Sequence, residues 1–195
     1  MGNCNYILLI VWQVCCLLPC AAQDGRFTVQ SITEADGLAQ DFIYSVLQDD
    51  RGYVWVGTGK GLSRFDGVKM ENYSTQRGLA GNFVTASYQA ADGLLYFGHF
   101  QGGISLYNGF AFKAIQQDSL GSRIIAFAED DAHTIWVASQ ANGLGFLNNK
   151  KKISWLVNEN LKDVIINDMR WHQQKLWVAT NEGLITFTIA NQQCN

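Results

Sequence analysis

Short apolar runs that alternate with polar residues, separated by glycine-rich or acidic turns, follow one another along most of the chain. The first group consists of four such segments, at 42–48, 53–58, 62–65 and 69–73. The first segment ("FIYSVLQ") alternates, and the second ("YVWVGT") is rich in β-branched and aromatic residues, which favours strands. The Asp66–Gly67 pair before the fourth segment is typical of a hairpin turn. The pattern therefore predicts four short antiparallel strands, and helical periodicity is absent beyond residue 22.

This group of strands recurs along the chain at a nearly constant period. Trp55 in the second strand has counterparts at Tyr96, Trp136 and Trp177, with spacings of 41, 40 and 41 residues. Around them "VWVGT" becomes "LYFGH", "IWVAS" and "LWVAT", and Gly-Leu pairs keep the same register. Four antiparallel strands in a repeat of this length are typical of one β-propeller blade. The sequence therefore predicts an all-β protein, a β-propeller with four four-stranded blades in this chain.

The repeat also sets the expected boundaries. We place the propeller repeats at 23–190, with blades at 34–73, 74–113, 114–157 and 158–190, an extra outer strand at 26–33, and a tail at 191–195. The last unit ends after its third strand, and 26–33 has the position of the missing fourth one. The blades either close into a small ring completed by 26–33 or form an open arc. We favour the open arc, whose exposed apolar blade faces would make a lone copy sticky or oligomeric.

The anchors of the repeat indicate packing. Trp55, Trp136 and Trp177 would each bury a flat surface against the next blade, so we assign them to the inter-blade core and not to a sugar-stacking platform. A Gly or Ala two residues later lets neighbouring backbones come close. Acidic residues recur at the turn between the first and second strands, where a plain turn is favoured over calcium binding.

The first 22 residues differ from the rest. Residues 7–18 are apolar apart from Gln13, a stretch too short to cross a bilayer and typical of a secretory signal peptide. Cys20 and Ala22 are small residues at the −3 and −1 positions of a cut before Gln23. We therefore expect a signal peptide at 1–22 and export. Lipidation at Cys20 is the alternative, which Pro19 disfavours.

Charge and cysteine content exclude several classes of function. The net charge of −3 gives no nucleic-acid or anionic-membrane footprint. Beyond the leader the chain keeps only Cys194, so neither a disulfide framework nor a cysteine metal site is predicted. His99, His133 and His172 fall at different places in their repeats and do not converge as metal ligands would. We predict no catalytic residue, metal or cofactor, and thus not an enzyme.

One stretch, "GLAQDFIYSVLQDDRGYVWVGTGKGLSRFDG" (37–67), resembles the two-component regulator propeller repeat. The shared features are the Gly-Leu pairs, the Asp-x-x-Gly turn, the aliphatic-Trp-aliphatic-Gly-Thr run and the aromatic-Asp pair. Later units match less well, and the fourth has "RWHQQ" in place of the acidic turn. The resemblance implies a periplasmic sensor propeller of a bacterial histidine kinase or hybrid two-component system, and many of these resemble receptors for glycan fragments.

The resemblance also implies partners that this chain does not contain. Such propellers normally precede a β-sandwich, a membrane helix and a kinase. The family resembles propellers whose rings have seven blades. The chain has no kinase phosphoacceptor box or ATP-binding motif. We therefore expect an amino-terminal fragment whose partners are the remaining blades or kinase domains of the same receptor, with membrane attachment through those parts.

Topology places a candidate ligand site on one face of the propeller. The loops between blades and those between the second and third strands emerge together there. Amides, charges and Phe side chains suit an oligosaccharide or another small ligand, although Asp41, Asn82 and Arg123 are equivalent and could each simply cap their own loop. The face would collect Gln40, Asp41, Lys60, Asn82, Phe83, Phe100, Gln101, Arg123, Gln140, Asn142, Asn181 and Glu182.

Three functions remain open from the sequence. The first is a periplasmic ligand-sensing propeller of a two-component receptor. The second is a stand-alone secreted scaffold that binds a protein partner. The third is a propeller lyase or hydrolase acting on sugars, which would need a charged cluster at the axis that the first strands of the blades do not obviously provide.

Overall fold

A computed structural model describes residues 28–115, 121–148, 152–157, 161 and 163–188. The predicted signal peptide and tail lie outside these residues. The chain divides into two units, 1–31 and 32–195, and the described strands belong to the second.

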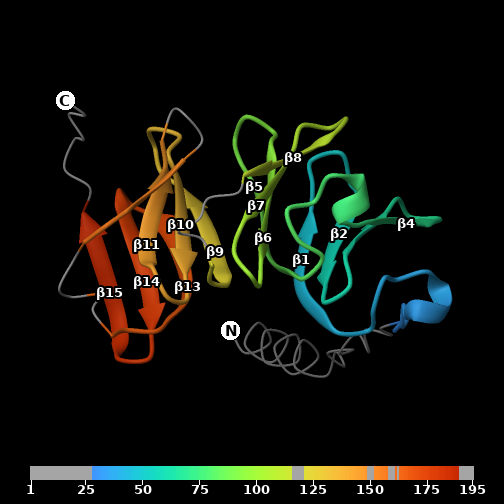
Figure 1. Ribbon diagram of the computed structural model, residues 1–195, viewed down its shortest axis with the longest axis horizontal. Helices are drawn as coiled ribbons and strands as arrows, with labels where there is room; N and C mark the ends of the chain where they lie inside the picture. Colours follow the sequence, from blue (N-terminus) through green and yellow to red (C-terminus); the bar gives the residue numbers. More distant parts are fainter. Residues whose placement is uncertain (1–27, 116–120, 149–151, 158–160, 162, 189–195) are drawn as a thin grey trace, which may run out of the picture. The chain divides into compact units, whose positions relative to one another are not determined.

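The described part of the chain contains four antiparallel sheets (Figure 1). The first has β1 (Ile43–Gln48), β2 (Val54–Thr58), β3 (Leu62–Phe65) and β4 (Met70–Tyr73). The second has β5 (Val84–Gln89), β6 (Leu95–His99), β7 (Ile104–Tyr107) and β8 (Phe112–Ile115). The third has β9 (Ile124–Glu129), β10 (Ile135–Ser139), β11 (Gly143–Leu147) and β12 (Ile153–Trp155). The fourth has β13 (Ile166–His172), β14 (Lys175–Thr180) and β15 (Gly183–Thr188).

Each sheet is a meander whose neighbouring strands follow each other in sequence, which confirms the predicted propeller blades. Contacts between blades run in chain order, from β1 to β5, from β5 to β9 and from β9 to β13. No comparable contact joins the first and fourth blades among the described residues. The blades therefore form the open arrangement that we favoured, and not a closed four-bladed ring.

The extra outer strand predicted at 26–33 is wrong for its described part, because residues 28–33 carry no strand. The chain bends at the end of this segment. The backbone N–H and the hydroxyl of Thr33 both donate to the Asp36 carboxylate, at 2.9 and 3.0 Å, and this begins the short 3-10 helix η1 (Glu34–Asp36). The same kind of turn, η2 (Thr75–Arg77), leads into the second blade.

Large apolar side chains between successive blades form the core. Trp55 is fully buried, and its ring lies 5.3 Å from that of Phe97 and 5.1 Å from that of Tyr107, both in the second blade. Trp136 is buried in the same way between the third and fourth blades. The prediction of inter-blade packing is thus confirmed for these two residues. Trp177 is half-exposed, because no described blade follows the fourth.

The small residue after each anchor is explained by the next blade. A β-carbon at Gly57 would clash with Ser45 Oγ of its own blade and lie 2.9 Å from Cγ1 of Val84, and one at Gly98 would lie 2.5 Å from Cγ2 of Ile124. Val84 and Ile124 are fully buried side chains at the start of the following blade, so they cannot easily move aside. Glycine is therefore required here by the close approach of two sheets.

A buried carboxylate ties the turn of the first blade to its tryptophan. Asp49 Oδ2 accepts a hydrogen bond from Trp55 Nε1 at 2.8 Å. Asp49 Oδ1 accepts from the backbone N–H groups two and four residues further on, at 3.1 and 2.9 Å. Asp130 repeats all three bonds around Trp136. The recurring aspartate is therefore a turn and anchor residue, as the plain-turn interpretation expected.

The same turns bind the first strand of the next blade. The Asp50 N–H donates to Gln89 Oε1 at 3.0 Å, and the Ala91 N–H donates to Glu129 Oε2 at 2.7 Å. At the turn of the third blade the direction of the hydrogen bond reverses. There the turn residue Asp131 accepts, through Oδ1, from Trp171 Nε1 in β13 at 2.8 Å. A polar contact thus fixes the position of each blade against its successor, beside the apolar layer.

In the second blade, the last residue of β6 is a buried histidine. His99 is 1% exposed, and its Nε2 lies 2.7 Å from Ser105 Oγ, which also accepts from the Ala80 N–H. Burial lowers the pKa of His99 to about 4. Thr58 has the equivalent position in the first blade, and its hydroxyl donates to the Gly61 carbonyl.

We predict that Asp49→Ala destabilises the fold by about 3 kcal/mol, because it leaves a buried indole N–H and two turn amides without their acceptor. Urea denaturation measures the free energy of unfolding. Asp50→Ala is the matched control, because that neighbour is exposed and its backbone N–H is retained, so a change within about 0.5 kcal/mol is expected. Equal losses in both variants would contradict the role assigned to Asp49.

We also predict that the fold loses stability at acidic pH, and that His99→Thr makes this loss smaller. The folded-state pKa of His99, about 4, is below the ordinary value of 6.5, so the unfolded chain binds the proton more readily. Above pH 6.5 the neutral form of His99 makes its full contribution to the free energy of unfolding. About 3 kcal/mol of this free energy is lost as the pH falls towards 4. Urea titrations at several pH values should show a smaller loss for His99→Thr than for the natural chain. Parallel curves for the two proteins would refute the assignment.

Candidate functional site

Two of the predicted site residues cap their own loops. Asp41 Oδ1 accepts from the Glu34 N–H at 2.6 Å, and Asn82 Oδ1 accepts from the Thr75 N–H at 2.8 Å. Both bonds close the short 3-10 turn that precedes the blade. The alternative interpretation, in which these residues cap their own loops, is therefore correct for Asp41 and Asn82, although both side chains remain exposed.

Arg123, the third member of this equivalent set, behaves differently. Its side chain is half-buried, and its Nε has no hydrogen-bond partner among the described residues. Its carbonyl accepts from the Gln140 N–H at 2.9 Å, which joins the two loops that the sequence placed together. The guanidinium is thus a cationic group held beside the loops of the third blade.

The other polar candidates lie in the loops of their own blades. Gln40 is half-buried against Gly59, and its Oε1 has no partner among the described atoms. Asn181 Oδ1 accepts from the Ile165 N–H at 2.8 Å, which closes a loop of the fourth blade. Lys60, Gln101, Gln140 and Glu182 are exposed, and Asn142 is half-buried.

An aromatic row joins the first two blades at this face. The rings of Phe83 and Phe100 are stacked, with centroids 4.7 Å apart and planes 15° apart. The Phe100 N–H donates to the Phe83 carbonyl at 2.9 Å, which fixes their loops to each other. Tyr44 extends the row, with its ring 4.6 Å from that of Phe83. Phe100 is 45% exposed and Tyr44 is 42% exposed, so the row offers open aromatic surface.

Sequence reasoning missed Tyr44. It belongs to β1, whose alternation indicated a strand and gave no sign of a site. The predicted loop residues and Tyr44 meet because β1 and β5 lie side by side, which no local pattern encodes.

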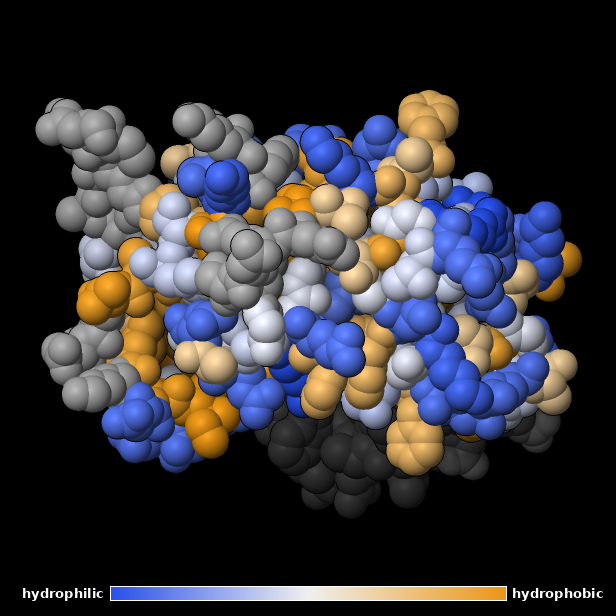
Figure 2. Space-filling model, viewed as in Figure 1, coloured by the Kyte–Doolittle hydropathy of each residue, from blue (hydrophilic) through white to orange (hydrophobic). Residues whose placement is uncertain are grey.

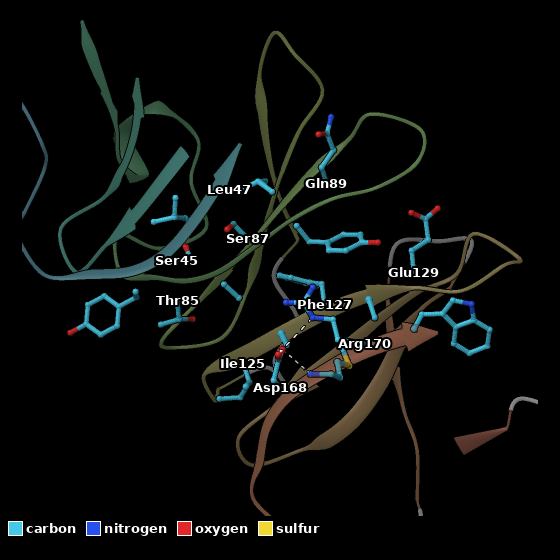
Figure 3. Close-up of a pocket in the computed structure, with 18 of the residues that line it drawn as sticks. Ser45, Leu47, Thr85, Ser87, Gln89, Ile125, Phe127, Glu129, Asp168 and Arg170 are labelled. Atoms are coloured by element: carbon cyan, nitrogen blue, oxygen red, sulfur yellow. Dashed lines mark hydrogen bonds and ion pairs between the residues drawn. The ribbon is translucent and has the colours of Figure 1, made fainter. Parts of the chain in front are cut away.

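The first strands of the blades line a hollow of about 700 Å³ (Figure 3). Tyr44 is one of its lining residues, so the aromatic row and the hollow are continuous. Its wall is mixed, with hydroxyls such as Thr85 and Ser87 beside apolar groups such as Phe127. This hollow is large enough for a small ligand.

Charged groups also reach the hollow, which the sequence did not lead us to expect. Glu129, Asp168 and Arg170 all line it (Figure 3). Arg170 Nε lies 3.8 Å from Asp168 Oδ2, in an exposed ion pair. Glu129 Oε1 lies 2.7 Å from His133 Nδ1, and its Oε2 accepts from the backbone of the second blade. Burial and the Glu129 charge raise the pKa of Tyr88, whose phenol therefore stays neutral at neutral pH.

Within the described ranges, no group of three or more His, Cys, Asp or Glu side chains could hold a metal ion. Glu129 is already engaged through both oxygens. In the described part of the chain, no helix has the length and apolar content of a membrane span.

Comparison with known proteins identifies the repeat. Residues 37–60 match the two-component regulator propeller family. Histidine kinase P4 of Formosa agariphila is 42% identical over 52 residues, which are 27% of this chain and 4% of that protein. The chain therefore spans a small part of this relative's length.

Solved structures share the fold. The extracellular domain of a putative one-component system from B. thetaiotaomicron is 20% identical, with a TM-score of 0.72 over 87% of this chain and 24% of that one. A virginiamycin B lyase from Staphylococcus aureus is 12% identical, with a TM-score of 0.57 over 75% of this chain and 55% of that one. At these identities the likeness is one of fold. Residues 37–60 thus match the two-component regulator propeller family, and the sheets around them share the β-propeller fold of the solved structures.

Proposed function

We propose that the chain is the ligand-sensing part of a two-component receptor and acts in the periplasm after export by its 1–22 leader. The observation that carries this proposal is the open aromatic row of Tyr44, Phe83 and Phe100 beside the hollow. The match of the first blade to the regulator propeller family supports the sensory role.

We infer that the ligand is an oligosaccharide or a fragment of one. Flat aromatic faces pack against the C–H edges of sugar rings, and an exposed stacked pair provides such a face without further ordering. Amide side chains of the neighbouring loops, such as Gln101 and Gln140, are exposed and can bond to hydroxyls. Arg123 would add a cationic group for an acidic sugar.

Ligand binding has to be passed on to a signalling domain. The relative from Formosa agariphila is named a histidine kinase, and it is far longer than the segment that matches this chain. We propose that the remaining blades or kinase domains of one receptor receive the signal. The contacts that fix each blade against the next, such as Asp50 with Gln89, give a ligand between two blades a means to shift their relative position.

A binding role also explains the charged groups of the hollow better than a lyase or hydrolase role. Asp168 and Arg170 pair with each other, and no serine or threonine that lines the hollow is hydrogen-bonded to a histidine or a carboxylate, since the buried pair of His99 and Ser105 lies outside the hollow. The lyase neighbours share the fold, which by itself carries no activity.

We predict that Phe100→Ala weakens oligosaccharide binding roughly 10-fold, because it removes the exposed half of the stacked pair. The experiment screens a panel of soluble neutral and acidic oligosaccharides by isothermal titration calorimetry and repeats each hit with the variant. Phe110→Ala is the matched control, since that ring is 91% exposed in the outer turn of the second blade and should leave binding unchanged.

Two results would contradict the proposal. The first is that no member of the panel binds the natural chain. The second is that a sugar binds with equal affinity to the natural chain and to Phe100→Ala, which would place the ligand elsewhere.

A further inference from the structure

The strand register shows which residues of successive blades occupy the same place in the candidate site. In each blade, the first residue of the first strand lies opposite the last residue of the second strand. One residue beyond this pair, the second blade has Phe83 and Phe100, whose rings stack. The third blade has Arg123 and Gln140 there. Arg123 and Gln140 therefore take the place of the stacked aromatic pair.

A backbone hydrogen bond supports this equivalence. The Phe100 N–H donates to the Phe83 carbonyl at 2.9 Å. The Gln140 N–H donates to the Arg123 carbonyl at 2.9 Å as well. The two loops of the third blade are thus joined in the same way as those of the second blade, and the side chains of both pairs begin from matching backbone positions.

Arg123 is therefore not the structural counterpart of Asp41 and Asn82, although a constant repeat length places it with them. The reason is that the second and third anchors are 40 residues apart and not 41. The true counterpart is Ser122, whose Oγ accepts a hydrogen bond from the Ala141 N–H at 2.8 Å. Ser122 holds the loop, so the Arg123 side chain is not needed as a cap.

The second and third blades approach each other closely at this place. Tyr44, the bulged residue of β1, lies against Phe83 of the next blade, with ring centroids 4.6 Å apart. Thr85 is the bulged residue of β5, and its hydroxyl donates at 2.7 Å to the carbonyl of Ile124, the residue after Arg123. The step from Tyr44 to Phe83 is thus repeated from Thr85 to Arg123. Arg123 is the next position of the row, in the third blade.

The Arg123 guanidinium has the chemistry of an anion-binding group. The side chain is half-buried, and its Nε is shielded from solvent without a hydrogen-bond partner among the described residues. None of the ion pairs in the described part of the chain includes it. A buried donor without an acceptor is costly, and a planar guanidinium matches the oxygens of a carboxylate or a sulfate group. An anionic ligand group would supply the missing acceptor.

The second blade combines apolar and polar surface, as a sugar ligand requires. Figure 2 shows hydrophilic and apolar side chains intermixed over this blade, in the middle of the view. Phe100 provides a flat aromatic face, and Gln140 at the matching position of the third blade is an exposed amide that can bond to hydroxyls. A ligand that stacks on Phe100 therefore meets polar groups where it extends towards the third blade.

We propose that the sensed ligand is an anionic oligosaccharide and that Arg123 selects it. One sugar stacks on Phe83 and Phe100, and a carboxylate or sulfate group of the adjoining sugar binds the Arg123 guanidinium. The assignment depends on the proposed function, which places a sugar on the aromatic row, and it makes the negative charge a requirement for tight binding. Two interior blades supply these groups, so the selection does not depend on what covers the first and fourth blades.

Isothermal titration calorimetry measures this selection with pairs of sugars that differ only in charge. The probes are oligogalacturonates with their methyl esters, and sulfated galactose oligosaccharides with their desulfated forms. The acidic member of a pair should bind the natural chain roughly 30-fold more tightly than the neutral member. In Arg123→Gln the two affinities should agree within about 2-fold. Added salt should weaken binding of the acidic sugar to the natural chain far more than to the variant.

Two further variants are controls. Arg123→Lys keeps the charge but loses the planar pair of donors, so we expect an intermediate preference for the acidic sugar. Lys113→Gln removes an exposed positive charge from β8, the outer strand of the second blade, and should leave the preference unchanged. All variants should keep the strand signature in circular dichroism, because the hydrogen bond between Arg123 and Gln140 involves the backbone alone.

Phe100→Ala separates the selection for charge from the sugar site itself. Stacking does not depend on the charge of the sugar, so this variant should weaken acidic and neutral members alike. If no sugar binds the natural chain, the proposed function fails and the role of Arg123 fails with it. If acidic and neutral sugars bind equally, the sugar site stands and the selection for charge is refuted. A preference that persists in Arg123→Gln places the anion at another group and overturns the role of Arg123.

Discussion

The packing of each blade on its successor is the interaction on which the rest of this structure depends. A four-stranded sheet of this size has two faces and cannot bury either by itself. Trp55 shows how the protein solves this, because side chains of its own blade and of the next blade together bury its ring completely. Stability is therefore a property of pairs of blades, as in other repeat proteins, and it is weakest where a blade has one neighbour.

The recurring aspartate connects this packing to local structure. Asp49 holds a tight turn and, through the same carboxylate, the indole of the anchor tryptophan. The second blade lacks this arrangement, since Ala90 has the position of Asp49 and Tyr96 that of Trp55. There the N–H of Leu94, the counterpart of Tyr53, donates instead to Asp92 Oδ1 of the same turn at 3.0 Å. The sequence can therefore drift at one anchor while another aspartate of the turn supplies part of the missing contact.

The candidate site also depends on the adjacency of blades. Tyr44 comes from the first blade, while Phe83 and Phe100 come from the second, and the hollow beside them takes side chains from all four inner strands. A ligand in this place would contact several blades at once. A sensor built in this way can respond to a ligand by small changes between rigid sheets, without unfolding any of them.

The sequence by itself determined the repeat, the strand order within each blade and the residues that anchor the turns. These features are local, because alternation, glycine turns and the spacing of Trp55 from its counterparts act within one blade. It also predicted that Asp41 and Asn82 could serve as loop caps, since they occupy equivalent positions. It was wrong about a strand in 28–33, where a capped turn follows, and about the burial of Trp177.

The tertiary structure alone decided what covers each surface. The identical motif position is fully buried at Leu62 and open at Leu184, although the local sequence is alike. It also decided that Tyr44 joins the aromatic row and that Glu129, Asp168 and Arg170 gather around the hollow. These facts depend on which sheets are neighbours, and burial follows from the neighbour rather than from the residue itself.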